Sequence, residues 1–267
     1  MEIIILKNTQ QVAAMGAELV GELLRARPAA VLGLATGSTQ LALYQHLVNK
    51  YQNGDISFRQ STSFNLDEYL GVAAENPQSY RSYMNREFFD SIDIDKHNTF
   101  LPQCEDGENP RLVGPRYEDK IQNAGGIDLQ LMGLGANGHI GFNEPSSSLR
   151  SRTRVKTLTR QTLKDNSRLF SEDEFQPKLA ITMGIATIMD ARSILLLATG
   201  ESKAGAVSKM IEGPVSAMCP ASILQMHERA TILLDETAAA GLKNRDYYDW
   251  THLQNESLKS RFSTFHD

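Results

Sequence analysis

The chain has 267 residues and a net charge of −5, from 27 lysines and arginines against 32 aspartates and glutamates. This acidic balance argues against sequence-independent binding of nucleic acid, which needs a basic surface. No stretch approaches the ~18 apolar residues that span a bilayer, and the first apolar run is too short for a signal peptide. The two cysteines, Cys104 and Cys219, lack metal or disulfide spacing. We expect a cytoplasmic protein that binds neither nucleic acid nor membrane.

Short apolar runs alternate with helical patterns along the whole chain, and no repeat or domain boundary interrupts them. Continuous apolar runs are typical of strands buried on both faces of a parallel sheet. The alternation predicts one α/β domain over residues 1–267, with an open, mostly parallel, doubly wound sheet and helices on both faces. The predicted strands lie near residues 2–6, 29–35, 61–66, 127–134, 193–199 and 230–235, and predicted helices begin near 9, 40, 77, 112, 204 and 245.

Two helix starts are specified by local chemistry. Thr9 is the expected N-cap of the first helix. Asn76 and Pro77 are expected to open another, with proline at its first position, since that position needs no N–H donor. In that helix Tyr80, Met84 and Phe88 recur at four-residue steps, which favours a core stripe over a recognition surface.

Loops suited to anions follow two of the predicted strands. The first holds Thr36, Gly37, Ser38 and Thr39, and the second ends in Lys203. A loop of this kind before a helix supplies free N–H groups, hydroxyls and the helix dipole. A plain helix cap explains the first loop equally well, and both interpretations stay open at this point.

A third strand, near residues 127–134, ends in a glycine-rich loop that carries His139 and Glu144. Such loops present backbone N–H groups and let a ligand approach closely. Gly133, Gly135 and Gly138 also match the dinucleotide fingerprint, but that motif needs a helix at its third glycine and an acid about 20 residues on. Pro145 and a basic segment occur instead, so an NADP site is kept only as an alternative.

Asp67 directly follows the predicted strand at 61–66, so we expect a functional carboxylate at the carboxyl end of this strand. Ligands of open α/β sheets gather outside the carboxyl ends of the strands. Asp67 should therefore meet His139, Glu144 and the anion loops, which suggests proton transfer on a small phosphorylated substrate. Neither a metal-ligand spacing nor a serine-nucleophile elbow is present in the sequence, so we expect no metal and no cofactor.

Four segments together resemble glucosamine-6-phosphate deaminase. They are Thr-Gly-Ser-Thr at 36–39, Phe-Asn-Leu-Asp-Glu-Tyr at 64–69, Gly-x-Asn-Gly-His-Ile-Gly-Phe-Asn-Glu-Pro at 135–145 and Asn-Ser-Arg at 166–168. The third is the specific one, and the similarity extends along nearly the whole chain. The resemblance implies a Rossmann-like fold, often in homohexamers, that converts D-glucosamine 6-phosphate and water into D-fructose 6-phosphate and ammonia without a redox cofactor.

The resemblance also implies residue roles. Asp67 should move a proton between C2 and C1 through an enolamine, and His139 should open the pyranose ring with Glu144 as its carboxylate partner. Arg168, Lys203 and the 36–39 loop should hold the 6-phosphate. Position 137 departs from the pattern, because Asn137 stands where well-known members carry aspartate. We expect it to orient the histidine while altering the pH profile.

Beyond the site, the 146–157 segment resembles the allosteric phosphate site of members activated by N-acetylglucosamine 6-phosphate. Its matching residues are Ser147, Arg154, Lys156 and Thr157. Residues 150–180 are the candidate lid over the active site.

Three alternatives share the fold or part of the pattern. They are 6-phosphogluconolactonase, a deaminase for galactosamine 6-phosphate, and the sugar-phosphate-sensing domain of a transcription regulator. The last would carry a helix-turn-helix ahead of it, and this sequence starts directly at its first predicted strand.

Overall fold

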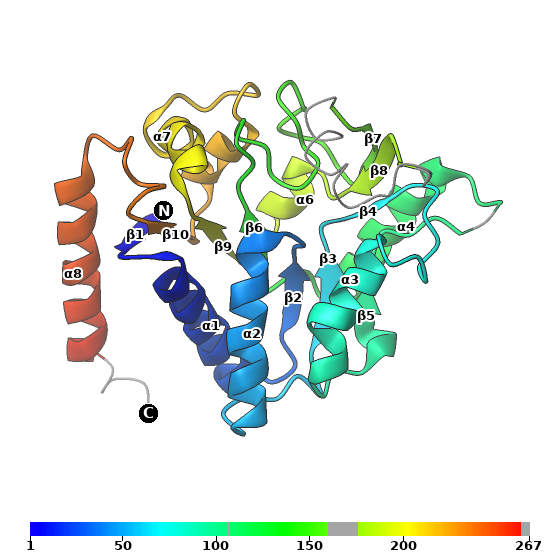
Figure 1. Ribbon diagram of the computed structural model, residues 1–267, viewed down its shortest axis with the longest axis horizontal. Coiled ribbons are helices and arrows are strands. Elements are labelled where there is room, and N and C mark those ends of the chain that lie inside the picture. The colour runs from blue at the N-terminus through cyan, green and yellow to red at the C-terminus, as the bar shows by residue number, and fades with distance from the viewer. Residues whose placement is uncertain (106, 160–175, 263–267) are drawn as a thin grey trace.

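A parallel sheet forms the centre of the molecule (Figure 1). The computed structural model describes residues 1–105, 107–159 and 176–262. Within these ranges the main sheet has seven strands in the order β1-β10-β9-β6-β2-β3-β5, and every neighbouring pair is parallel. The strands are β1 Glu2–Leu6, β2 Val31–Leu34, β3 Thr62–Asn65, β5 Thr99–Phe100, β6 Leu129–Gly133, β9 Ser193–Ala198 and β10 Ala230–Asp235.

Helices cover both faces of this sheet, as predicted (Figure 1). One face packs against α1, α2 and α3, and the other against α4, α6 and α7. The last helix, α8, packs against the edge strand β1. The helices span Thr9–Ala26 (α1), Ser38–Gln52 (α2), Tyr80–Glu87 (α3), Pro110–Asn123 (α4), Ile185–Met189 (α6), Ala204–Glu212 (α7) and Arg245–Phe262 (α8). No helix in the described ranges is both long and apolar enough to cross a membrane.

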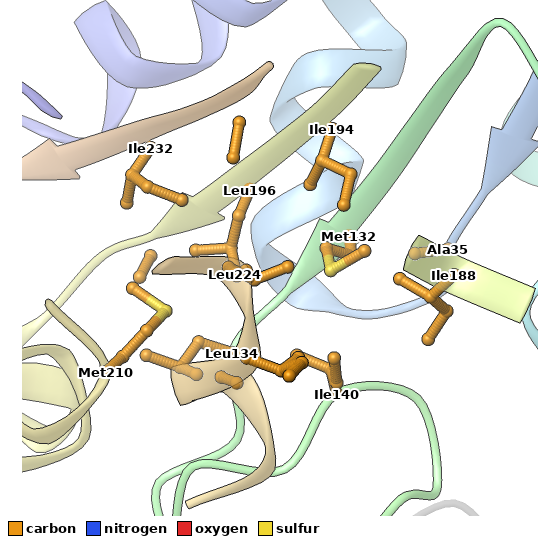
Figure 2. Packing of buried hydrophobic residues seen from close by; sticks show 14 of the residues in the cluster. Ala35, Met132, Leu134, Ile140, Ile188, Ile194, Leu196, Met210, Leu224 and Ile232 are labelled. Carbon is orange, nitrogen blue, oxygen red and sulfur yellow. The ribbon is translucent and has the colours of Figure 1, made fainter. Parts of the chain in front are cut away.

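The apolar runs form strands because successive side chains point to opposite faces and both faces are buried. In β6, Leu131 packs against the α1–α2 side, whereas Met132 packs against the other side. Figure 2 shows Met132 beside Ile194 and Leu196 of β9, in the hydrophobic cluster on the side of α4, α6 and α7. A run without polar alternation is therefore the expected sequence for these central strands.

The chain reverses direction across the sheet between β2 and β6. From β2 it continues outward to β3 and β5, then returns to β6 and continues outward the other way to β9 and β10. Ligands of open α/β sheets bind at such a switch point, beyond the carboxyl ends of the strands. The loops after β2 and β6 meet there, at residues 36–39 and 134–144.

A second, antiparallel sheet was not predicted. It has the order β4-β8-β7, with β4 Asp67–Tyr69, β7 Arg154–Thr157 and β8 Leu179–Thr182. Its strands are short and come from distant parts of the sequence, so no hairpin turn marks it. The chain passes from β3 through Leu66 directly into β4, and Asp67 pairs with Thr182 of β8. Asp67 thus lies where the two sheets adjoin.

The prediction of a helix opening at Asn76 and Pro77 was wrong. Helix α3 begins at Tyr80, and Ser79 is its N-cap, accepting a hydrogen bond from the backbone N–H of Ser82. Residues 76–79 form a turn instead, in which the Asn76 side chain accepts from the N–H of Gln78 at 2.8 Å. Local side-chain hydrogen bonds of this kind compete with helix formation.

The first helix also begins differently from the prediction. Asn8, not Thr9, is its N-cap, and its side chain accepts from the N–H of Gln11 at 3.0 Å. Asparagine and threonine are both favoured at this position, so sequence preference alone does not separate two adjacent candidates.

Candidate active site

A pocket of about 290 Å³ opens at the switch point of the main sheet. Its wall includes the Thr36–Thr39 loop after β2, the loop after β6, and side chains that the sequence places far apart. Asp67, His139 and Lys203 all line this one pocket. The convergence predicted from the strand ends is therefore present in the structure.

The Thr36–Thr39 loop leads into the N-terminus of α2. Gly37 precedes the helix with a φ of 129°, a left-handed conformation that favours glycine. Within the described chain no side chain caps α2, so the first N–H groups of the helix are available to a ligand. This arrangement argues against the plain helix cap and agrees with an anion site.

Asp67 lines the pocket although the residue is only 6% exposed. Burial raises its pKa to about 8, and the neighbouring negative charge of Glu68 adds to this effect. Hydrogen bonds from Thr182 and from the backbone of Phe142 act in the opposite direction and only partly compensate. A carboxylate with so little stabilisation of its charge is a strong base for its residue type.

The next residue, Glu68, organises the helix that faces the pocket. Its carboxylate accepts hydrogen bonds from the N–H groups of Tyr80 at 3.0 Å and Arg81 at 2.9 Å. It therefore binds the N-terminus of α3, where a negative charge is favoured. Glu68 thus fixes Tyr80 in the pocket wall while it repels charge on Asp67.

Sequence reasoning missed Tyr80, which it assigned to the core stripe. The side chain is half-buried and lines the pocket, stacking on Phe142 with ring centroids 6.1 Å apart. Its hydroxyl is 3.3 Å from that of Tyr69 and also hydrogen-bonds Thr36. Met84 and Phe88 of the same stripe are buried as predicted. A four-residue spacing cannot distinguish a pocket wall from a core.

His139, in the loop after β6, lines the same pocket and belongs to a chain of three polar groups. Its Nδ1 is 2.7 Å from Oδ1 of Asn137, whose Nδ2 donates to Oε2 of Glu144 at 2.7 Å. The direct distance from Nδ1 to that Oε2 is 3.5 Å. Because the Asn137 amide donates to Glu144, its oxygen accepts from His139, which places the proton on Nδ1 and leaves Nε2 as an acceptor.

The expected carboxylate partner of His139 is therefore bridged by an amide. Glu144 is buried, with its side chain 5% exposed against 27% for His139. Glu144 therefore acts on the imidazole both directly, at 3.5 Å, and through the Asn137 amide. Asn137 thus has the orienting position that we expected for it.

Two glycines allow these side chains to approach the backbone. A Cβ at Gly135 would lie 2.3–2.4 Å from three atoms of the His139 ring, so the ring packs directly on this glycine. A Cβ at Gly141 would lie 3.2 Å from Oδ2 of Asp67, and its φ is 54°. The absence of a side chain at these two glycines therefore leaves room for the His139 ring and the Asp67 carboxyl group.

The dinucleotide alternative is not supported by this geometry. The fingerprint needs a helix at its third glycine, but residues 134–153 form turns and a short bridge from Ile140 to Asn143.

The remaining predicted residues divide into two groups. Arg168 lies outside the described residues, as does most of the candidate lid. The predicted activator residues lie on β7 and the segment before it, not in the pocket wall: Ser147, Arg154, Lys156 and Thr157.

One group of side chains in the described chain could hold a metal ion, and it consists of Glu2, His252 and Glu256. This group joins β1 to α8 and includes no pocket residue.

The fold and pocket define an α/β protein with a switch-point site that suits a small anionic ligand. The chain belongs to the family described as glucosamine-6-phosphate isomerases/6-phosphogluconolactonase, whose model matches residues 7–233. It is 61% identical to a glucosamine-6-phosphate deaminase of Colwellia psychrerythraea over the full length of both chains. It is 56% identical to that of Shewanella woodyi, covering 98% of this chain and 99% of the relative.

Solved structures agree with this membership. A monomeric glucosamine-6-phosphate deaminase superposes with a TM-score of 0.87 at 41% identity, covering 91% of this chain and 100% of that one. The 6-phosphogluconolactonase of Trypanosoma brucei gives 0.71 at 23% identity, covering 90% and 98%. The second likeness shows a shared fold alone.

Proposed function

We propose that this protein is a glucosamine-6-phosphate deaminase, which converts D-glucosamine 6-phosphate and water into D-fructose 6-phosphate and ammonia. One observation carries the proposal: a buried carboxyl group and an imidazole whose Nδ1 contacts the Asn137 oxygen line the same pocket, beside an open helix N-terminus. Relatives at 61% and 56% identity bear this name.

Ring opening is assigned to His139. A neutral imidazole can accept the proton of the anomeric hydroxyl at Nε2 and return it to the ring oxygen, so the C1–O5 bond breaks without net proton loss. Asn137 holds the Nδ1–H tautomer. Glu144, behind Asn137, stabilises the transient imidazolium.

The proton shift is assigned to Asp67. Its carboxylate removes the proton from C2 of the open-chain sugar, giving an enolamine, and delivers the proton to C1. Water then adds at C2 of the resulting imine, and the C2–N bond breaks to release ammonia. A base with a pKa of about 8 is matched to this transfer near neutral pH.

The 6-phosphate is assigned to the Thr36–Thr39 loop and Lys203. The N–H groups at the start of α2 and the Lys203 ammonium line the same pocket as Asp67. Both favour a dianion. Arg168, outside the described residues, is proposed as a further phosphate ligand on the family resemblance.

The test is ammonia release from D-glucosamine 6-phosphate, compared with its galacto epimer and with 6-phosphogluconolactone as substrates. We expect ammonia from the gluco compound and no lactone hydrolysis. Preference for the galacto epimer would make galactosamine 6-phosphate the proposed substrate. Hydrolysis of the lactone without ammonia release would replace the deaminase assignment with that of a 6-phosphogluconolactonase.

We also propose activation by N-acetylglucosamine 6-phosphate at Ser147, Arg154, Lys156 and Thr157. The buried Ser147 hydroxyl has no hydrogen-bond partner in the described chain, and Arg154 donates to Oδ1 of Asn143 at 2.9 Å. Asn143 precedes Glu144, which gives the activator a short route to the His139 network. Substrate kinetics that are hyperbolic and unchanged by this compound would exclude activation.

A homohexamer is proposed on the same resemblance. Tyr247, Trp250 and Leu253 of α8 are exposed at three-residue steps, a pattern that contact with another copy would cover. The solved relative at 41% identity is monomeric, so sedimentation of this chain as a monomer would reject the hexamer.

Because Cys104 and Cys219 are free thiols, we propose a reducing, cytoplasmic location.

A further inference from the structure

A second cavity, of about 320 Å³, lies between α3, β5 and α4. Its wall carries three cationic side chains: Arg81 from α3, and Arg116 and Lys120 from α4. Phe100 and Tyr117 supply aromatic surface. None of these residues lines the pocket that holds Asp67 and His139.

Arg81 is half-buried without an ion-pair partner among the described residues. Its two terminal nitrogens donate to the side chain and the carbonyl of Thr99, at 2.7 and 2.9 Å. Burial lowers the pKa of the guanidinium, and Glu68 acts on it only from beyond ion-pair distance. A guanidinium has five N–H donors, so several remain for a ligand. Buried cations in proteins are normally paired.

Lys120 is a second cation without a carboxylate in ion-pair distance in the described chain. Its Nζ lies 5.0 Å from the ring centre of Phe100. Arg116, by contrast, is neutralised by both carboxylate oxygens of Glu108. The remaining acid of the wall, Glu105, is exposed. Glu68 acts on Arg81 and Glu108 acts on Lys120 electrostatically, but neither cation has a carboxylate within ion-pair distance in the described chain.

We propose that this cavity is a second ligand site, which binds a phosphate dianion, either free or carried by a small phosphomonoester. Two cations without an ion-pair partner in the described chain match the charge of a dianion, and the guanidinium fork suits phosphate oxygens. The volume falls at the lower end of the range for small-molecule sites. The proposal does not depend on the deamination.

The site also has a direct connection to the catalytic region. Tyr80 lines the first pocket and Arg81, the next residue, lines the second. Glu68 holds the N–H groups of both residues, and it follows Asp67 in the chain. A ligand on Arg81 therefore contacts the same turn of α3 that forms the wall beside Asp67.

The experiment is equilibrium dialysis with radiolabelled inorganic phosphate and, separately, with glycerol phosphate. It uses the wild type, Lys120→Gln, Arg81→Gln and a matched control, Arg86→Gln. Arg86 is an exposed cation on α3 that pairs with Glu87 outside the cavity. Phosphate held in the Asp67 pocket contributes to every isotherm, so the difference between Lys120→Gln and the control isolates the second site.

We expect the wild type and Arg86→Gln to bind one more phosphate per chain than Lys120→Gln and Arg81→Gln, or to bind it about tenfold more tightly. The same difference with glycerol phosphate identifies a phosphomonoester site, and a difference with inorganic phosphate alone identifies free phosphate. Identical isotherms for the control and Lys120→Gln with both probes would overturn the proposal. Lys120 is exposed, so its substitution tests the site even if Arg81→Gln fails to fold.

Discussion

The two regions that supply the acid–base groups of the candidate active site prepare them in different ways. At the start of β4, Asp67 is buried with few hydrogen bonds, and its pKa is raised to about 8 mainly by burial. In the loop after β6, His139 is partly exposed and is oriented by Asn137 and Glu144. Desolvation thus sets the strength of one base, while a hydrogen-bonded network sets the direction of the other. Substitutions at or near each group test this difference.

The largest effect is expected from Asp67→Asn. The amide keeps the shape and can accept the hydrogen bonds of Thr182 and Phe142, but it cannot take a proton from C2. Since general bases contribute about 10²- to 10⁴-fold, we expect kcat to fall by about 10³-fold in an ammonia-release assay. Turnover within tenfold of the wild type would remove Asp67 from its proposed role.

The same substitution should stabilise the fold above neutral pH. The folded pKa of Asp67 is raised from 3.8 to about 8, so between these values the unfolded chain ionises this group while the folded chain keeps it protonated. Its contribution to stability is complete below about pH 4 and is lost as the pH rises through 8.

The amide of the Asp67→Asn variant cannot ionise, so this loss is absent from the variant. In urea unfolding we expect its advantage over the wild type to grow from pH 5 to pH 8, to about 3 kcal/mol or more, because one pKa unit corresponds to ~1.4 kcal/mol. An advantage that is equal at both pH values would contradict the raised pKa.

In the loop after β6, Gly135→Ala should displace the His139 ring. Its Cβ would lie 2.3–2.4 Å from ring atoms, so the ring must move. A misplacement of about 1 Å costs roughly 10²-fold in rate, and we expect that loss in kcat with little change in unfolding. Gly205→Ala is the matched control, because its Cβ meets nothing within 4 Å. Equal activity of both variants would argue against His139 as an acid–base group.

Asn137→Leu tests the amide bridge itself. Leucine fills similar space but neither accepts from Nδ1 of His139 nor donates to Glu144, so the tautomer is no longer fixed. Loss of such a supporting hydrogen bond should lower kcat about tenfold. Asn137→Asp restores an acceptor and is expected to recover most of the rate, with an altered pH profile. A leucine variant as active as the wild type would show that the bridge has no catalytic importance.

The smallest effect is expected from Glu68→Gln. Its negative charge helps to raise the pKa of Asp67, so its removal should lower that pKa and move the acidic limb of kcat/KM to lower pH, by about one unit or less. The rate at pH 7 should rise a few-fold. Glu87→Gln, at the C-terminal end of α3 and paired with Arg86, is the control. A shift to higher pH would reverse the sign assigned to Glu68.

Local sequence patterns were sufficient for the main elements and for the place of the site. Continuous apolar runs such as Ser193–Ala198 predicted buried parallel strands, because only a strand covered on both faces needs no polar alternation. Asp67, His139 and Lys203 were assigned from strand ends and loops, because the carboxyl ends of parallel strands meet at one edge. These are local signals, and the structure brings the three residues together.

The packing of distant segments set what no local pattern could contain. In the antiparallel sheet, β4 pairs with β8 across more than 100 residues of sequence, as Asp67 does with Thr182. Tyr80 faces the pocket because Glu68 binds the first turn of α3, not because of its helical spacing. The amide bridge from His139 to Glu144 depends on how the glycine loop closes, and the pKa of Asp67 depends on burial. The distances between site atoms and the desolvation of side chains are set only when distant segments pack. A local sequence pattern therefore cannot specify them.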